Sequence, residues 1–249
     1  PPKELKSKGK TLVEHYLSIV TDRIKEIKAL TAYLAVDGYF MKREFIIPLI
    51  KKGLHVITKA RHDANLMYLY KGKQKPGKGR PRLYDGKVNT SAIDKRRIKG
   101  CYNDKNMKVY VGVVYCVQLK QLVLAAFIYY GDKERPEILI GTDIEMEAMT
   151  LCKYYGLRFQ VEFLIRDAKQ YSGLEDCQAR SKPKLCTHFN LSLTTVSIAK
   201  AAYYLSIPDT ERGSFSMADI KMMHMNKLIT NRIFSNLDLD LNSRKIKRI

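Results

Sequence analysis

The first thirty residues show the apolar spacing of a helix with a single buried face. Between residues 11 and 30, apolar side chains recur at alternating spacings of four and three, which places them on one side of a helix. They are Val13, Leu17, Val20, Ile24 and Ile27. An apolar run from Thr31 to Val36 follows and stops at Asp37-Gly38. It predicts a buried strand with a carboxylate at its C-terminal end.

The next segment continues the alternation of helix and strand. Residues 41–54 predict a helix, in which Pro48 either bends the chain or marks the first turn. Residues 54–60 predict a second strand. The order helix, strand, helix, strand over residues 11–60 is an α/β pattern. Sheets of this class usually place functional residues at the C-terminal ends of their strands, which is the position of Asp37.

The middle of the chain has a different pattern. The segment "KGKQKPGKGRPR", residues 71–82, contains no acidic residue and predicts an exposed basic loop. Residues 108–131 are rich in Val and Tyr and predict the strands of a β-meander. Residues 137–143 predict one more strand. We therefore divide the chain into a partial core (1–60), a β-rich insertion with the basic loop (61–136), and a continuation of the core with C-terminal helices (137–249).

A long helix is expected over residues 144–169, opened by a capping box of Thr142 and Glu145. At about 100° per residue, its polar side chains share an arc of roughly 60°. This polar stripe consists of Tyr155, Arg158, Glu162 and Lys169. Apolar side chains on the neighbouring arc would anchor the helix on a core; they are Leu157, Val161, Leu164, Ile165 and Ala168. Further helices are expected at 191–206 and 217–228.

Composition adds a strong positive charge. The 249 residues have a formal net charge of +20 and a sequence pI near 9.7, which points to polyanions, nucleic acid before anionic membrane. No apolar run of about 18 residues predicts a membrane span, and no secretory signal is visible. We therefore expect a cytoplasmic, nucleoid-associated protein.

The cysteines do not form a metal motif. Five cysteines without CxxC spacing are typical of reduced thiols. Cys177, Cys186 and His188 are an alternative as metal ligands, but their spacing matches no zinc pattern and a fourth ligand is not evident.

Two carboxylates are candidates for chemistry, and each also has a simple structural interpretation. Asp37 before Gly is a common turn residue. Glu162 and Arg158, four residues apart, would pair on an exposed helix face for a few tenths of a kcal/mol. Taken singly, both favour the structural interpretation. Taken together, a strand-end carboxylate and a helix carboxylate are the parts of a two-metal site. Mg²⁺ prefers hard oxygen ligands, and two ions about 4 Å apart can activate water.

The spacing Tyr155-x2-Arg158-x3-Glu162-x6-Lys169 resembles the Y-R-E-K signature of DDE transposases of the IS-four type of insertion sequence. The segment "LRFQVEFLIRDAKQ" is similar to that family's signature helix. The segment "YLAVDGYFMKREF" resembles the surroundings of its second catalytic Asp. The resemblance runs from about Leu12 to Asn236.

The resemblance implies a ribonuclease-H-like core with a β-rich insertion before the last catalytic helix. Asp37 would be the second catalytic acid and Glu162 the third, both binding a pair of Mg²⁺ or Mn²⁺ ions. Tyr155, Arg158 and Lys169 would hold the transposon end, Arg158 through paired contacts and Lys169 as a point charge on phosphates, and the tyrosine by stacking on a base or bonding a phosphate. The partner would be double-stranded DNA, both transposon ends and target, bound by a homodimer. The reaction would be metal-dependent hydrolysis followed by attack of the freed 3′-OH on target DNA.

The family's first Asp has no counterpart before Asp37. Asp22 lies inside the first amphipathic helix. Asp143, at the end of a later strand, is an alternative metal ligand, but it lies after the insertion and helix capping accounts for it. We therefore expect a catalytic domain without its first core strands, in a longer or decayed transposase, with little or no activity alone.

Two alternatives stay open: a non-catalytic DNA-binding remnant, and a metal-dependent nuclease of the same superfold. The basic loop 71–82 is either a solvated linker or a phosphate contact with salt-dependent affinity. The basic C-terminal tail has the same two interpretations.

Overall fold

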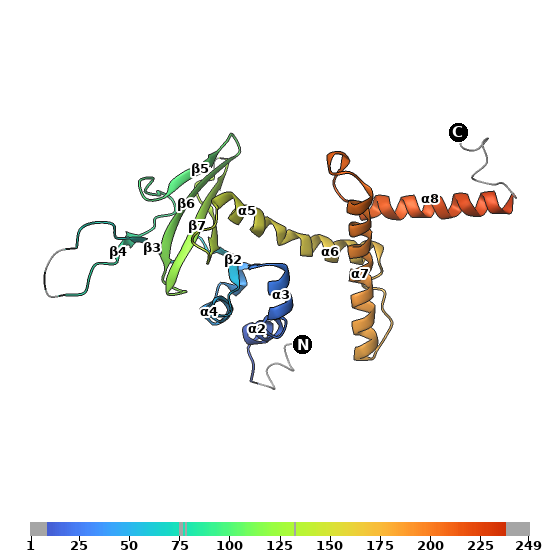
Figure 1. The fold of residues 1–249 in the computed structure, drawn as a ribbon, viewed down its shortest axis with the longest axis horizontal. Coiled ribbons are helices and arrows are strands. Elements are labelled where there is room, and N and C mark those ends of the chain that lie inside the picture. The colour runs from blue at the N-terminus through green and yellow to red at the C-terminus, as the bar shows by residue number, and fades with distance from the viewer. Residues whose placement is uncertain (1–8, 75–76, 78, 132, 238–249) are drawn as a thin grey trace. The chain divides into compact units, whose positions relative to one another are not determined.

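The computed structural model describes residues 9–74, 77, 79–131 and 133–237 (Figure 1). The chain divides into two compact units, Pro1–Arg158 and Phe159–Ile249, which we name the sheet unit and the helical unit. Among the described residues, no helix combines the length and the apolar character that crossing a membrane requires. Loop residues 75, 76 and 78 and the basic tail lie outside the described residues.

The sheet unit is built on one eight-stranded sheet in the order β1-β2-β8-β7-β6-β3-β4, with β5 paired to β6. The strands are β1 (Tyr33–Val36), β2 (His55–Ala60), β3 (Leu66–Leu69), β4 (Tyr84–Lys87), β5 (Lys99–Asn103), β6 (Met107–Cys116), β7 (Gln121–Tyr130) and β8 (Glu137–Gly141). β1 and β2 run parallel, and β2 and β8 antiparallel. The α/β fold class is confirmed. Strands from all three predicted segments belong to this one sheet. The division of the chain into segments at residues 60 and 136 stays a prediction.

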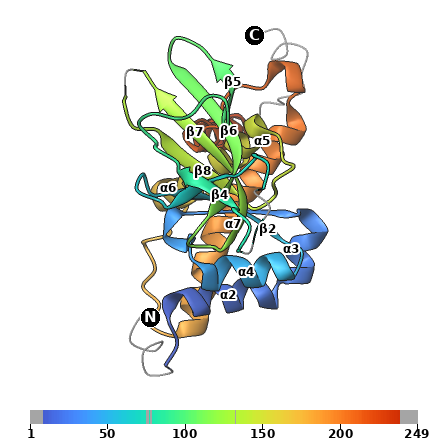
Figure 2. The ribbon, with the colours of Figure 1, turned by 90° about the vertical axis from the view of Figure 1, so that its left-hand side faces the viewer.

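One face of the sheet is covered by the N-terminal helices, and we name it the α4 face. These helices are α2 (Leu12–Asp22), α3 (Ile24–Leu30) and α4 (Arg43–Lys51), and α2 and α4 lie side by side (Figure 2). The predicted single helix over 11–30 is interrupted at Arg23. Its apolar face packs on the core as predicted, together with the fully buried side chains of α4, among them Phe45, Ile46 and Leu49. Pro48 lies inside α4.

The opposite face, the α5 face, is covered by α5 (Ala148–Leu157), whose Leu151 packs against Ile57 and Leu139. The prediction of a capping box at Thr142 is wrong, because that residue extends the sheet. Its N–H donates to the carbonyl of Val56 at 3.0 Å, and its hydroxyl accepts from the Val56 N–H at 2.9 Å. The helix therefore begins only at Ala148.

The helical unit contains α6 (Phe159–Tyr171), α7 (Lys182–Ser206), the short 3₁₀ helix η2 (Asp209–Glu211) and α8 (Met217–Asn236). The predicted helix over 144–169 is thus two helices, with Arg158 between them. The helices expected at 191–206 and 217–228 are present but longer. Of the predicted anchoring arc, Leu164 and Ala168 pack on Val196. The others, Leu157, Val161 and Ile165, are 53%, 57% and 41% exposed.

Candidate active site

Asp37 lies where the sequence predicts it, directly after β1. Its Oδ1 accepts a 2.6 Å hydrogen bond from the N–H of Gly38 and so caps the short 3₁₀ helix η1 (Gly38–Phe40). Its backbone carbonyl accepts a 3.1 Å bond from the hydroxyl of Thr58, which is fully buried. The backbone is therefore tied to β2 while the carboxylate is exposed.

The glycine after Asp37 is required by the close approach of η1 to β2. A Cβ at Gly38 would lie 2.8 Å from the backbone oxygen of Lys59. The Asp-Gly pair is thus a structural turn, as one interpretation held, and it also presents an exposed carboxylate at the end of a strand. The two interpretations of Asp37 are compatible.

Strand register places a cation beside this carboxylate. Val36 pairs with Thr58, and Ala60 with Ile138, so the C-terminal ends of β1 and β2 share one edge with the N-terminal end of β8. We name it the Asp37 edge. There the Lys59 ammonium lies 3.2 Å from the carboxylate of Glu137. Neither residue is among those predicted from the sequence, although both lie near strand ends, where functional residues are common.

The C-terminal end of α5 brings two residues of the polar stripe to the same region. Tyr155 is only 7% exposed and packs in the core of the α5 face. Burial raises the pKa of its phenol, the charge of Asp37 raises it further, and Arg158 and Lys59 lower it. The phenol thus lies within electrostatic reach of Asp37, Arg158 and Lys59. The Arg158 guanidinium lies 5.6 Å from the centre of the Tyr155 ring.

This packing corrects one feature of the predicted stripe. Because the ring of Tyr155 is covered by the sheet, it cannot also stack on a base. Of the two contacts expected from the sequence, only one made by the hydroxyl group is compatible with the structure.

The other two stripe residues belong to the helical unit. Glu162 lies in the first turn of α6, and Lys169 in the last turn; both are exposed. The ammonium of Lys169 pairs with the carboxylate of Glu175 at 2.5 Å. The stripe therefore crosses the boundary between the two units, and the meeting of Glu162 with Asp37 stays a prediction.

The alternative acid, Asp143, lies at the opposite edge of the sheet. It follows β8, whose C-terminal end lies beside the N-terminal ends of β1 and β2. Its Oδ2 accepts a 2.6 Å bond from the hydroxyl of Tyr33, and its Oδ1 a 3.0 Å bond from the N–H of Glu145. The Tyr33 bond lowers the pKa of Asp143. The predicted role as a helix cap is wrong, since Asp143 is held by a partner distant in sequence.

The carboxylate of Asp37 is a suitable ligand for a divalent cation, but too few further ligands lie beside it among the described residues. The Asp37 carboxylate is the hard oxygen ligand that Mg²⁺ prefers. However, no three His, Cys, Asp or Glu side chains gather into a metal site within the described ranges. His188 belongs to the alternative zinc site considered from the sequence. Its Nε2 lies 2.8 Å from the backbone oxygen of Gly173, so this ring nitrogen is engaged within the protein.

Two adjoining hollows flank Asp37 and share Gly38 and Arg61 in their linings. One is also lined by Lys59 and His62, the other by Lys42. Basic side chains of this kind are suited to binding the phosphates of a nucleic acid. Glu137 and Asp63 also line these hollows and pair with Lys59 and Arg61. The Asp37 edge therefore combines an exposed carboxylate with several cations, two of which are paired with carboxylates.

Comparison with known proteins identifies the family of the chain. No curated protein sequence matches the chain significantly. The family model of the transposase DDE domain matches residues 12–197, a range that contains Asp37 and the whole polar stripe. Because this match covers well over half of the 249 residues, the chain belongs to the transposase DDE domain family.

Proposed function

We propose that the protein is the catalytic domain of an IS-four-type transposase, which cuts DNA at the ends of its element and joins the freed 3′-OH to target DNA. Membership of the family supports a role in transposition and an enzyme that acts on DNA. The observation that supports the finer proposal is the exposed Asp37 carboxylate at the end of β1. Its charge acts on the Tyr155 phenol, as do the charges of Arg158 and Lys59.

In this proposal Asp37 and Glu162 hold divalent metal ions, Mg²⁺ or Mn²⁺. A bound pair of such ions activates a water molecule and stabilises the leaving oxygen. Arg158 and Lys169 bind phosphates of the transposon end, Arg158 with the planar geometry that suits paired hydrogen bonds. The Tyr155 hydroxyl, kept protonated by burial of its ring, donates a hydrogen bond to the same backbone. Two protomers act together on the DNA.

We also propose that a third carboxylate completes the site and that this polypeptide alone cleaves DNA slowly. Two carboxylates neutralise and fix a metal pair less well than three. Among the described strands, β1 pairs only with β2, and in this proposal a further strand lies parallel to β1 on its other side. Such a strand would end beside Asp37.

The direct test is metal-dependent nicking of supercoiled plasmid by the chain in excess Mn²⁺. Asp37→Asn and Glu162→Gln should each abolish nicking and leave DNA affinity within about twofold, because each removes only one charge of an exposed carboxylate. Asp22→Asn, which changes an exposed acid of α2, is the matched control and should nick like wild type. Equal nicking by Asp37→Asn and wild type would overturn the assignment.

The second candidate function, a DNA-binding remnant without chemistry, is favoured by the lack of a three-ligand metal group in the described residues. Mn²⁺ separates the two without relying on activity. In the catalytic proposal, the paramagnetic ion should broaden the amide NMR signal of Gly38, which donates to Asp37. Asp37→Asn should prevent this broadening. A signal that stays sharp in Mn²⁺ favours the remnant. A nuclease of the same superfold would nick but yield no 3′-OH joined to target DNA.

A further inference from the structure

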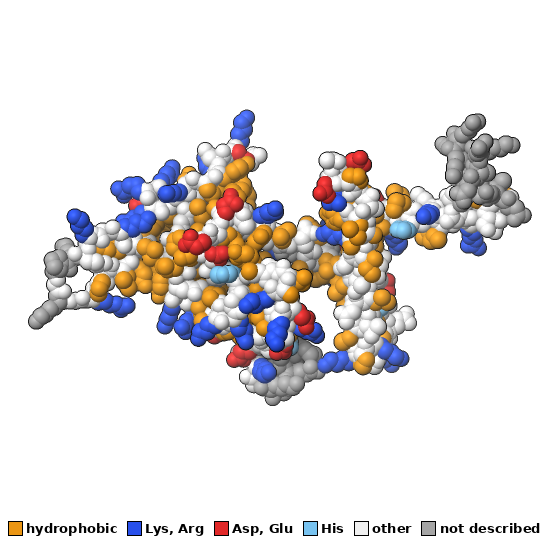
Figure 3. All heavy atoms as spheres, in the orientation of Figure 1, with side chains coloured by type: hydrophobic (Ala, Val, Ile, Leu, Met, Phe, Trp, Pro, Cys, Tyr) orange, Lys and Arg blue, Asp and Glu red, His pale blue; other side chains and the backbone are white. Residues whose placement is uncertain are grey.

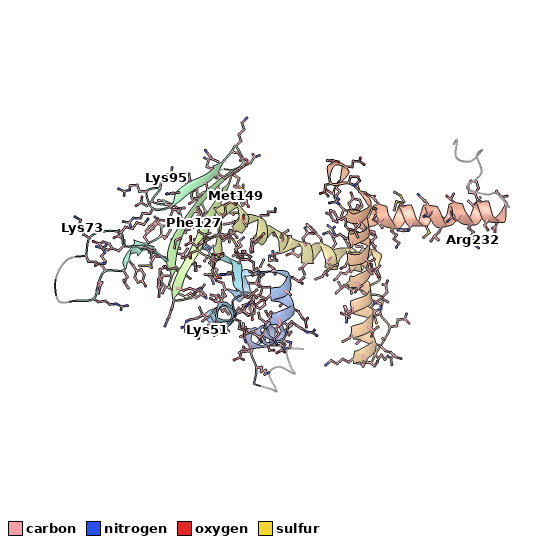
Figure 4. The ribbon with its side chains drawn as sticks, in the orientation of Figure 1. Lys51, Lys73, Lys95, Phe127, Met149 and Arg232 are labelled. Atoms are coloured by element: carbon pink, nitrogen blue, oxygen red, sulfur yellow. The ribbon has the colours of Figure 1, made fainter. Side chains whose placement is uncertain are left out.

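A basic hollow lies in the sheet unit, apart from the residues discussed so far. Three exposed lysines line it, Lys95, Lys108 and Lys133. The remaining lining is neutral; it consists of Ser91, Ala92, Ile93, Tyr110, Tyr129 and Gly131. No carboxylate of the described residues lines the hollow. Figure 3 shows Lys and Arg side chains gathered over β4 and β5, and Figure 4 shows Lys95 beside β5.

The lysines come from three segments on a fixed support. Lys95 follows β4 in a loop, Lys108 is on β6, and Lys133 follows β7. The hydroxyl of Tyr129 donates a 2.6 Å bond to the backbone oxygen of Thr90 and ties the loop to β7. Burial raises the pKa of Tyr129 to about 12, so the phenol keeps its proton at neutral pH. The Lys95 ammonium lies 5.8 Å from the centre of the Tyr110 ring.

Strand register places the hollow at the same end of the sheet as the Asp37 edge, on the α4 face, where Tyr110 and Tyr129 pack on the core. Lys108 pairs with Tyr129, and the preceding residue of β7, Ile128, pairs with Glu137. Glu137 of β8 in turn contacts Lys59 of β2. β2 is two strand positions from β7 and adjoins β1, the strand that ends before Asp37. Four strand steps separate β1 from β6. At about 4.8 Å per step this is roughly 19 Å, or about six base pairs of duplex at 3.4 Å each.

We propose that Lys95, Lys108 and Lys133 bind backbone phosphates of duplex DNA that extends from the Asp37 edge across β8 and β7. The proposal rests on the proposed function, since it takes the same DNA as ligand and adds where the duplex runs. Lysine contacts phosphate as a point charge, and contacts to backbone phosphates carry no direct sequence information. Binding here is therefore independent of sequence.

The test is the salt dependence of affinity for a 20-base-pair duplex, measured by fluorescence anisotropy without divalent metal. The triple variant Lys95→Gln, Lys108→Gln, Lys133→Gln should lower the slope of log affinity against log salt by about 2 to 3, since each lost phosphate contact removes about 0.9. The control Lys25→Gln, Lys51→Gln, Lys52→Gln removes the same charge from exposed positions that precede β2. Lys51 lies at α4, well away from Lys95 (Figure 4). The control should keep the slope within about 0.5.

The outcomes separate this proposal from the catalytic one. A slope in the triple variant equal to that of wild type or of the control overturns the basic hollow as a phosphate site, even where Asp37→Asn abolishes nicking. A lowered slope supports the hollow even where Asp37→Asn nicks normally, a result that overturns only the catalytic assignment. A wild-type chain that does not bind the duplex at low salt overturns both.

Discussion

Two aspartates follow strands of the same sheet, one half-buried and one buried, and the surroundings of the two carboxylates differ. Asp37 follows β1 at one edge, accepts a hydrogen bond from its own neighbour Gly38, and is exposed among cationic groups. Asp143 follows β8 at the other edge, where Tyr33, a residue 110 positions away in sequence, holds it at 2.6 Å. One carboxylate is available to a ligand, and the other is engaged within the protein.

The difference shows that a strand-end position alone does not identify a catalytic acid. What distinguishes the two residues is the partner of the carboxylate. A local backbone N–H leaves further lone pairs of Asp37 to accept other groups. The side-chain and backbone donors around Asp143 stabilise its charged form and lower its pKa. Exposure with cations nearby is the better criterion for metal and phosphate chemistry.

The largest expected effect separates the two aspartates by activity. Asp37→Asn should lower Mn²⁺-dependent plasmid nicking by at least about a hundredfold, the scale of losing one electrostatic contact to a reacting group. Asp143→Asn should change the rate by less than about threefold, because the substitution acts at the far edge of the sheet. Initial rates measured at equal fractions of folded protein compare them. A greater loss of nicking activity in Asp143→Asn than in Asp37→Asn would mean that Asp143, and not Asp37, is the catalytic acid.

The second effect tests how the backbone at Asp37 is built. Gly38→Ala should destabilise the protein by about 1 to 3 kcal/mol, because the new methyl group meets a backbone oxygen of β2 rather than a movable side chain. Gly156→Ala in α5 is the matched control, since its Cβ would meet nothing within 4 Å. That change should stabilise the helix by up to about 1 kcal/mol. Urea unfolding measures both, and an unchanged midpoint for Gly38→Ala would show that β1 and β2 can separate there.

Local patterns allowed much of the fold to be predicted. The apolar periodicity of residues 11–30 and the run ending at Asp37 predicted α2, α3 and β1, because each pattern reflects a face buried on the core. The Val- and Tyr-rich segment became the paired strands β6 and β7. The apolar pattern did not predict the interruption of the first helix at Arg23 or the start of α5 at Ala148.

Contacts between distant segments could not be predicted from the sequence. Thr142 looked like a cap because Glu145 stands three residues later, but its hydroxyl bonds to Val56 of β2. Tyr155 shared a helical arc with charged residues, yet the sheet covers it. Lys59 and the basic hollow became visible only through strand register. These cases have the same physical origin. The side chain contacts a residue from a distant part of the chain instead of the neighbour that the local sequence suggests.

The third effect concerns the engaged aspartate. Tyr33→Phe removes the donor to Asp143 and should lower the free energy of unfolding by about 1 to 2 kcal/mol, the scale of a hydrogen bond to a charged group at a partly exposed site. Tyr39→Phe, at an exposed tyrosine, should change it by less than about 0.5 kcal/mol. Equal effects of the two substitutions would mean that the Tyr33 bond contributes nothing to stability.

The smallest effect is the pH dependence of that bond. The bond lowers the pKa of Asp143 in the folded state, below the value of about 3.9 expected when the chain is unfolded. The folded state therefore binds fewer protons than the unfolded state, and stability from this group is present above about pH 4 and is lost as the pH falls through the folded pKa. The difference in unfolding free energy between wild type and Tyr33→Phe should thus be constant near neutrality and shrink toward pH 3. In the Asp143→Asn background the effect of Tyr33→Phe should show no such change in acid, because neither of the two compared proteins then carries the titrating group. A wild-type advantage that grows as the pH falls would mean that Asp143 is protonated in the folded protein, and the contrast with Asp37 would then rest on geometry alone.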